Sequence, residues 1–542
     1  MTTMTMNQFI KENTMGEGTA FTENGAVSYA SMGKEILNQF GKAGTARGRD
    51  ISDVWCDQQK LWTENPLYAL RFPFYLRMIT RKVKSFDGKA TETVQRGQGA
   101  RDEAFKRLLW IAKFHKDIFE KYIHILPLVG SFKDLWTIML LDNNKVVSRK
   151  HIFSIIGTYL TREDSSDLVK KYLPAIRSDR NLTPQRAKLN HLAKEFAKYL
   201  GITNAEYRLL KSSGTAHDFQ KLMCGREYDK INWAHIPGKA LLNIVSSKFL
   251  ANHNLEDNYS NWLDTQPVAK FNGYPFELLN TLVKNGNGCY ANLMNLPLYV
   301  LKTVDKQFDN LIKTGGQDGG ALSGNILCAL DTSGSMTAKI TENVSSYDVC
   351  VSLGIYFSEL NKGAFHNVVA MFDDTSSLLT LNGTFSEKVN QIMHEESAWG
   401  STDFQSLIDL ICETREKHPE IPLSDFPETL LVVSDMQFNP VFGNTSSNYK
   451  EAMKKLSRYF PQEYVDKFKI VWWYCTNRTT SDFPSTMDDA GTYMISGFDG
   501  SVISFLLGGE GFSGKENKQS PSMEEIIQMA LNQEILKDIV LE

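Results

Sequence analysis

The chain has 542 residues, of which 42% are hydrophobic and 23% are charged, and its formal net charge is −4. This length is sufficient for two or more domains, each with its own core. The slightly acidic balance argues against nucleic-acid binding through overall charge. A local basic face stays open, because net charge says nothing about distribution.

Residues 1–50 are polar and rich in Thr, Asn and Gly, so we expect an irregular N-terminal arm. This segment lacks the basic start and apolar block of a secretory signal. No uninterrupted apolar stretch approaches the ~20 residues needed to cross a bilayer. The seven cysteines are scattered without CxxC spacing, which is typical of free thiols in a reducing compartment. We therefore expect a soluble cytoplasmic protein with no membrane partner.

Residues 51–312 have the apolar spacing of helices. In the segment TPQRAKLNHLAKEFAKYLG, Thr183 suits a helix N-cap and Pro184 suits the first helical position. The next helix begins with the capping-box pattern of Thr203 and Glu206. Successive helices with short connections predict a stacked helical array, although the sequence has no detectable fixed-period repeat.

A glycine-rich segment, KTGGQDGGALSG at residues 313–324, is the clearest linker candidate. It lacks the GxxxxGK[ST] pattern of a phosphate-binding loop. After it, short apolar runs such as NILCALD, NVVAMFD, TLLVVSD and KIVWWYCTN alternate with helical segments. This alternation predicts a doubly wound α/β domain with a mostly parallel sheet over residues 325–512. Residues 513–542 are expected to form a helical tail, and the fold class as a whole is α plus α/β.

Oxygen-bearing side chains follow the predicted strands of this α/β domain. Asp331, Ser333 and Ser335 follow the run NILCAL, Asp435 follows LLVVS, and Thr402 lies in a Gly-Ser-Thr loop before a helix. Ligands of a doubly wound sheet bind beyond the carboxyl ends of its strands. Two carboxylates and three hydroxyls suit Mg²⁺ or Mn²⁺ rather than Zn²⁺. A single Asp-x-Ser is more often a turn or helix N-cap, but three such segments within one α/β pattern favour a cation site.

The segments DTSGS, GSTDF and SDM resemble the metal-ion-dependent adhesion site (MIDAS) of von Willebrand factor A domains, whose pattern is DxSxS…T…D. The resemblance covers roughly residues 324–510. It implies that three hydroxyls touch the ion directly, that two acids lie close to it, commonly through water, and that an open coordination position accepts a partner's carboxylate. The implied metal residues are Asp331, Ser333, Ser335, Thr402 and Asp435.

The chain departs from the A-domain pattern at its last element. The family often has Thr-Asp-Gly there, whereas this chain has Ser434, Asp435 and Met436. Because the acid is kept, the departure concerns the geometry of the loop more than the metal.

A helical array followed by an A domain is also the layout of the Ro ribonucleoprotein family, the TROVE-module RNA-binding proteins. The segments RGQGARDEAFKRLLWIAKF, PLVGSFKDLWTIML, AEYRLLKSS and GFDGSVISFLLGG are similar to a related group of uncharacterised viral, plant and bacterial proteins. The helical resemblance covers about residues 60–312. In the Ro family, HEAT-like repeats form a ring that admits single-stranded RNA ends and binds structured small RNAs outside. The resemblance therefore implies a HEAT-like array and an RNA partner.

A basic run lies in the segment RMITRKVKSFDGKATETVQRGQGARDEAFKR, with few acids before Asp102. Such a run can pair with phosphates, and Phe86 or Trp110 offers a stacking surface. A solvated loop and the polar side of a helix explain the run equally well. The predicted RNA-binding residues are Arg77, Arg81, Lys82, Lys84, Arg96, Arg101, Lys106 and Arg107.

Enzyme motifs are absent from the sequence: it has no GxSxG elbow, no HExxH motif and no metal-ligand spacing among its dispersed histidines. We expect a non-catalytic protein. The leading interpretation is RNA binding by the helical region, with an A domain that stabilises the array or recruits a protein through Mg²⁺. The alternative is a protein–protein adaptor in which the helices form a scaffold and the metal captures an acidic side chain. In a third interpretation, the metal only stabilises its domain.

Overall fold

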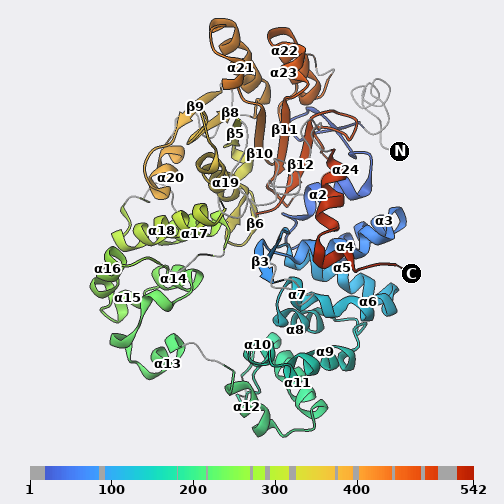
Figure 1. Cartoon of the computed structure of the whole chain (residues 1–542), viewed down its shortest axis with the longest axis vertical. Coiled ribbons are helices and arrows are strands. Elements are labelled where there is room, and N and C mark those ends of the chain that lie inside the picture. Colours follow the sequence, from blue (N-terminus) through green and yellow to red (C-terminus); the bar gives the residue numbers. More distant parts are fainter. Residues whose placement is uncertain are drawn as a thin grey trace, which may run out of the picture. The chain divides into compact units, whose positions relative to one another are not determined.

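The structure is a computed structural model, and it describes residues 19–84, 92–179, 181–214, 218–268, 271, 273–286, 293, 295–315, 325–372, 376–394, 402–441, 443, 446–477, 482–498 and 522–541; of residues 81–84, 92–94, 218, 220 and 315 it describes the backbone alone. The chain folds into two compact units, and each is described by itself (Figure 1). We call Met1–Arg47 with Pro237–Ala530 the sheet unit. Gly48–Ile236 with Leu531–Glu542 form the helical unit.

A six-stranded sheet lies at the centre of the sheet unit, in the order β12-β11-β10-β5-β8-β9. Five strands are parallel, and β9 pairs antiparallel with β8 at one edge. Both β5 and β10 are buried along their whole length, and their unbroken apolar runs are what a sheet covered on both faces requires. The strands are β5 (Ile326–Asp331), β8 (Val368–Phe372), β9 (Ser377–Thr380), β10 (Thr429–Ser434), β11 (Lys469–Tyr474) and β12 (Thr492–Ser496).

Helices alternate with these strands along the chain and flank the sheet (Figure 1). Helix α19 packs against β5, β8 and β10, and α21 packs against β8. The predicted α/β class with a mostly parallel sheet is confirmed. The elements between the strands are η6 (Gly334–Thr337), β6 (Lys339–Thr341), β7 (Val344–Ser345), α19 (Ser346–Leu360), α20 (Phe385–Met393), α21 (Phe404–Lys417), η7 (Leu423–Asp425), α22 (Asn448–Tyr459) and α23 (Gln462–Val465), and α24 (Met523–Leu531) follows the last strand.

Five helices that the sequence groups with the helical region belong instead to the sheet unit. Helix α17 packs on α19, and α18 packs on α19 and α20. Asp305 of α18 accepts hydrogen bonds from the backbone N–H and the hydroxyl of Ser386, at 2.9 and 3.0 Å. The compact units therefore divide at residue 237 and not at the glycine-rich segment, of which residues 313–315 end α18 and the rest lie outside the described residues. These helices are α14 (Gly238–Val245), α15 (Phe249–Asn252), α16 (Glu256–Thr265), α17 (Pro275–Asn285) and α18 (Leu298–Gly315).

The helical unit is a succession of mostly short helices with one β-hairpin (Figure 1). The Thr183 hydroxyl accepts from the N–H of Arg186 at 3.4 Å, and Thr203 and Glu206 form the predicted capping box. The predicted helical array is confirmed. Its elements are α3 (Ile51–Glu64), α4 (Pro66–Arg77), β3 (Arg81–Lys84), β4 (Glu92–Gln95), α5 (Arg101–Phe114), α6 (Lys116–Tyr122), η1 (Ile123–Ile125), α7 (Leu126–Val129), α8 (Phe132–Leu141), α9 (Arg149–Thr161), α10 (Ser166–Tyr172), α11 (Pro184–Tyr199), α12 (Asn204–Ser212), α13 (Asp218–Gly225), η2 (Tyr228–Lys230), η3 (Trp233–His235) and α25 (Glu534–Lys537).

The N-terminal segment differs from the irregular arm that the sequence predicted. Residues 19–47 form a hairpin and a helix within the sheet unit. A hairpin of β1 (Thr19–Phe21) and β2 (Val27–Tyr29) precedes α2 (Glu35–Ala43), which packs against β12. Its apolar residues are few, but Ile36 and Phe40 are fully buried. Their burial depends on partners more than 400 residues away, which the local composition does not reveal. Residues 1–18 lie outside the described residues.

Two properties of the chain concern its environment. Within the described ranges, no helix combines the length and the apolar character that a membrane span requires. The six cysteines among the described residues are free thiols, and four of them are buried: Cys328, Cys350, Cys412 and Cys475.

Candidate metal centre

The candidate site lies at the carboxyl end of the sheet, where the strand order reverses. After β5 the chain continues to β8 and β9 on one side of β5, and it then returns to β10 on the other side. Val433 of β10 lies opposite Leu330 of β5, so the strand ends Asp331 and Ser434 are neighbours. Open α/β sheets bind ligands at such a switch point.

Both carboxylate oxygens of Asp331 accept hydrogen bonds. The N–H of Ser333 donates to Oδ1 at 3.0 Å, and the hydroxyl of Ser434 donates to Oδ2 at 2.5 Å. The Cys350 thiol of α19 lies 3.4 Å from the carbonyl oxygen of Asp331 and 3.2 Å from that of Val433. These contacts hold a fully buried acid in one orientation at the switch point.

The two serines after Asp331 present their hydroxyls together. The Oγ atoms of Ser333 and Ser335 lie 3.0 Å apart, across the short turn that begins η6. Thr332, between the acid and the serines, is 1% exposed, and its hydroxyl has no hydrogen-bond partner among the described residues. The turn therefore gathers hydroxyl oxygens beside a carboxylate, and such oxygens are ligands for a hard cation.

The second acid follows β10 in a loop of unusual backbone conformation. Asp435 is 1% exposed, and its Oδ1 accepts from the N–H of Gln437 at 3.2 Å. Met436 has φ +64°, and its N–H donates to the Ser434 hydroxyl at 2.8 Å. A left-handed conformation costs a residue with a side chain roughly 1–2 kcal/mol. The loop thus has at Met436 the conformation that a glycine favours, although the glycine of the A-domain pattern is absent.

Electrostatics at the site favour a bound cation. Burial, and then the neighbouring charge of Asp435, raises the pKa of Asp331 to about 7, while the hydrogen bonds from Ser333 and Ser434 act in the opposite direction. In the part of the chain that the structure describes, no Lys, Arg or His side chain forms an ion pair with Asp331. Two close, buried carboxylates are unfavourable unless a positive charge compensates them. The residues therefore fit a hard divalent cation.

Thr402 reaches this region through its backbone. Its carbonyl oxygen accepts from the N–H of Asn439 at 2.8 Å, which ties the loop before α21 to the loop after β10. Asp403, the next residue, caps α21 by accepting from the N–H of Gln405 at 2.9 Å. Among the described residues, no three His, Cys, Asp or Glu side chains gather to hold a metal, so the candidate centre depends on its hydroxyls.

Of the five predicted metal residues, the structure brings Asp331, Ser333, Ser335 and Asp435 together, and it connects the Thr402 loop to them through the loop after β10. The sequence prediction gave no role to Ser434, whose hydroxyl links the two acidic loops. The sequence feature that could have identified Ser434 is its position next to Asp435 at the end of an apolar run.

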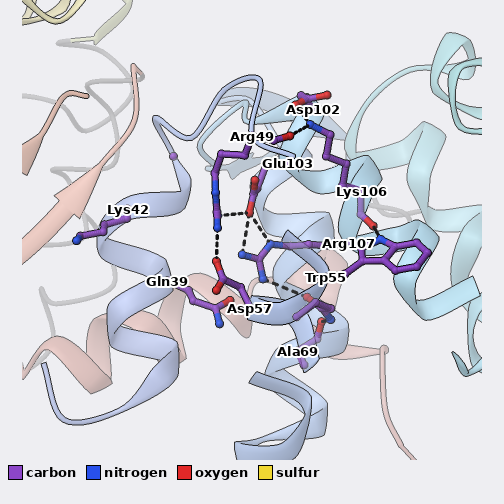
Figure 2. A network of polar contacts seen from close by, with 12 residues as sticks. Gln39, Lys42, Arg49, Trp55, Asp57, Ala69, Asp102, Glu103, Lys106 and Arg107 are labelled. Carbon is purple, nitrogen blue, oxygen red and sulfur yellow. Dashed lines mark hydrogen bonds and ion pairs between the residues drawn. The ribbon is translucent and has the colours of Figure 1, made fainter. Parts of the chain in front are cut away.

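Four of the eight predicted RNA-binding residues form side-chain ion pairs within the helical unit. Arg107 is fully buried; its Nη2 lies 2.8 Å from Oε1 of Glu103, and its Nη1 donates to Gln58 at 3.1 Å. Arg49 pairs with the same Glu103 oxygen at 3.3 Å and with Asp57 at 2.6 Å. Figure 2 shows the two guanidinium groups converging on Glu103. This corrects the prediction for Arg107, because a phosphate cannot reach a buried, compensated guanidinium.

Three other predicted cations form ion pairs within the helical unit. Arg77 and Arg101 share Asp134, with N–O distances of 2.6 and 3.2 Å. Lys106 pairs with Asp102 at 2.7 Å and also donates to the carbonyl of Arg49. Each of these partners reduces the positive charge that a phosphate would meet.

The rest of the basic run lies on or beside a hairpin. Arg81, Lys82 and Lys84 belong to β3, which pairs antiparallel with β4, and their side chains lie outside the described ones. The backbone N–H and carbonyl of Arg96 both bond the Gln533 side chain, at 2.8 Å each. The run is therefore a short two-stranded hairpin followed by internally paired helix residues.

Comparison with known proteins finds a family match, a viral relative and a similar solved structure. Residues 325–538 match a family described as a domain of unknown function, DUF7788; the match begins one residue before β5. An uncharacterized protein of Acanthamoeba polyphaga mimivirus, L728, is 24% identical over 538 residues, covering 91% of this chain and 85% of its own. The structure is also similar to the crystal structure of the Ro (RSR) protein of Deinococcus radiodurans, with a TM-score of 0.38 and 12% identity, over 86% of this chain and 97% of that one.

Proposed function

We propose that this chain is a non-catalytic binding protein whose sheet unit holds Mg²⁺ or Mn²⁺ and uses the ion to capture a carboxylate of a protein partner. The observation that carries the proposal is the pair of buried acids, Asp331 and Asp435, at the switch point of the sheet. Serine hydroxyls lie beside them, and Asp331 has no basic partner among the described residues.

The residues at this centre would have two roles. The hydroxyls of Ser333, Ser335 and Thr402 would contact the ion, and the two acids would balance its charge. The bound ion supplies a compact positive charge with a free coordination position, for which an acidic side chain is a suitable hard ligand. The Ser434 hydroxyl keeps Asp331 oriented, so the acid is prepared for the ion before the ion arrives.

RNA binding by the helical unit is the second candidate, and the observation that favours it is the β3–β4 hairpin. Three cations, Arg81, Lys82 and Lys84, follow one another closely along β3. The paired cations Arg77, Arg101 and Lys106 are poorer candidates, because a phosphate would have to compete with an existing carboxylate. The adaptor interpretation therefore has the stronger support.

Titration calorimetry with Mn²⁺ and with Mg²⁺ tests the metal centre. We expect the wild-type chain to bind one ion and Asp435→Asn to lose binding, because one of two charge-balancing acids is removed. Asp409→Asn is the matched control, because Asp409 lies on α21 with a half-exposed side chain that pairs with Lys455 at 2.6 Å. Absence of binding by the wild type, or undiminished binding by Asp435→Asn, would refute the proposal.

Partner capture is tested by the same variants, with an acidic peptide array as the probe. Binding that EDTA removes and that Asp435→Asn lacks supports the adaptor function. If the ion binds, raises the melting temperature and yet recruits no acidic peptide, the metal serves stability only and the adaptor function is wrong.

Gel-shift binding of a mixed small-RNA pool at two salt concentrations tests the second candidate. RNA binding through the hairpin predicts a shift that weakens steeply as salt rises and that disappears when Arg81, Lys82 and Lys84 are all changed to Glu. Reversing the exposed charges of Lys194 and Lys198 on α11 provides the control. The absence of a shift at low salt would exclude RNA binding as a function of the helical unit.

A further inference from the structure

The turn of the N-terminal hairpin lies directly on the loop that follows Asp435. The Thr22 hydroxyl donates to the carbonyl of Phe438 at 2.8 Å, across 416 positions of sequence. The N–H of Glu23 donates to the side-chain oxygen of Gln437 at 2.6 Å, and the Asn24 side chain donates to the carbonyl of Gln437 at 2.6 Å. The turn thus bonds the loop through three consecutive residues of its own.

The turn is itself fixed, so it can hold the loop in place. Thr22 is 7% exposed; its hydroxyl also accepts from the N–H of Ala26 at 2.9 Å, and its N–H donates to the Ala26 carbonyl at 3.0 Å. Gly25 has φ +89°, which a tight turn requires. Both ends of β2 form bridges, Val27 with Ser447 and Tyr29 with Phe483. The hairpin is therefore anchored at its turn and along its second strand.

Hydrogen bonds within the loop connect the hairpin to both acids, Asp435 and Asp331. The N–H of Gln437, whose side chain the hairpin bonds, donates to Asp435 Oδ1 at 3.2 Å. The N–H of Met436 donates to the Ser434 hydroxyl, which in turn donates to Asp331 Oδ2. A residue such as Met436 keeps a left-handed conformation only where its surroundings impose it. The hairpin belongs to these surroundings, because it bonds Gln437 and Phe438, the two residues after Met436.

Gln437 has a fourth hydrogen bond, made by its side chain to Asp482. Its side-chain nitrogen donates to Asp482 Oδ2 at 3.2 Å, within a buried environment. Together with the contact from Glu23, this fixes both ends of the Gln437 amide. The residue therefore cannot turn without breaking a bond to the hairpin or to Asp482.

We propose that the N-terminal hairpin is part of the metal centre, with Thr22, Asn24 and Gln437 as positioning residues that hold Asp435 ready for the ion. The proposal rests on the proposed function, since it concerns the affinity of that same site for a divalent cation. Residues that orient metal ligands typically contribute tenfold to a hundredfold to metal affinity.

The test is Mn²⁺ titration calorimetry on the full chain, with melting temperature measured in parallel. The double variant Thr22→Val/Asn24→Ala removes the two side-chain donors, and we expect its Mn²⁺ affinity to fall by about tenfold or more. Thr22→Ser keeps the hydroxyl and is expected to bind as the wild type does. Lys34→Ala is the control, because it breaks a half-exposed ion pair with Glu524 in the same segment without touching the loop. Asn24→Ala alone, at an exposed position, serves if the double variant does not fold.

The outcomes separate the two proposals. Wild-type binding with undiminished affinity in the double variant overturns the role of the hairpin and leaves the metal centre intact. Equal losses in the double variant and in Lys34→Ala also overturn it, because the effect would then be one of general stability. No Mn²⁺ binding by the wild type removes the proposed function, and this inference with it.

Discussion

Met436 illustrates how one residue can satisfy two opposing demands. Its backbone adopts the left-handed conformation at φ +64°, while its side chain is 1% exposed and belongs to the core. A glycine at this position would remove the strain of the left-handed backbone conformation. It would also leave a cavity where the Met436 side chain packs in the core. Methionine at this position therefore accepts a strained backbone conformation in return for a filled core, directly after the acid Asp435.

Met436→Gly should destabilise the protein by about 1–4 kcal/mol. Losing a buried Met side chain costs about 2–5 kcal/mol, and relief of the backbone returns roughly 1 kcal/mol. Urea unfolding monitored by tryptophan fluorescence measures the difference. Increased stability would show that strain, and not packing, dominates at this position.

His115 should make the protein sensitive to acid. Its ring stacks on Trp62 with centroids 4.0 Å apart, and burial lowers its pKa from the ordinary value of 6.5. Because the folded state resists protonation, the contribution of His115 to stability is complete above pH 6.5 and is lost as the pH falls through the folded pKa.

Melting temperatures of the wild type and His115→Phe between pH 7 and pH 5 measure this effect. Phenylalanine keeps an aromatic ring against Trp62 but does not titrate. The wild type should lose more stability than the variant across this range. Parallel curves would contradict the assignment.

At the scale of elements, helix α5 shows why charged residues in a row do not establish a binding surface. Arg107 and Lys106 lie four residues after Glu103 and Asp102, the spacing that places opposite charges together on a helix. That spacing was visible in the sequence. What was not visible is that one pair is wholly buried while the other is partly exposed.

Glu103→Ala should therefore destabilise the helical unit by about 3–5 kcal/mol, because it leaves Arg107 and Arg49 without their shared counter-charge. Asp102→Ala, which breaks the partly exposed pair with Lys106, should cost about 1 kcal/mol or less. Urea unfolding of both variants compares them directly. Similar losses would mean that the buried network contributes no more than a surface pair.

At the scale of the whole molecule, the chain returns to its helical unit at the end. Arg71, which is 5% exposed, donates to the carbonyls of Ile539 and Lys537 at 2.9 and 3.0 Å. The Tyr122 hydroxyl donates to the carbonyl of Val540 at 2.6 Å, and the Leu536 side chain is fully buried. Arg71 also donates to the side-chain oxygen of Asn532, so the acceptors of this buried arginine lie in the C-terminal segment and depend on its being present.

Deleting residues 532–542 should loosen α4 in particular, because Arg71 would be left buried without its acceptors. Hydrogen–deuterium exchange should accelerate in α4 and stay unchanged in β5. Glu534→Ala, which removes only an exposed ion pair with Lys537 within the tail, is the control. Unchanged exchange in α4 would show that the tail contributes nothing to it.

The sequence by itself determined most elements of this protein and the acids of its candidate site, but not the β1–β2 hairpin, α2 or the β3–β4 hairpin. Apolar period, capping residues such as Thr203 and strand-ending acids such as Asp331 are local signals, and local backbone preferences act on them directly. Only the tertiary structure decided that α14–α18 join the sheet unit, that Arg107 is buried, and that Thr22 and Asn24 hold the loop of Asp435. Each of these depends on a partner distant along the chain or on the burial of a charge, and a buried charge is stable only where packing supplies a counter-charge or hydrogen-bond partners.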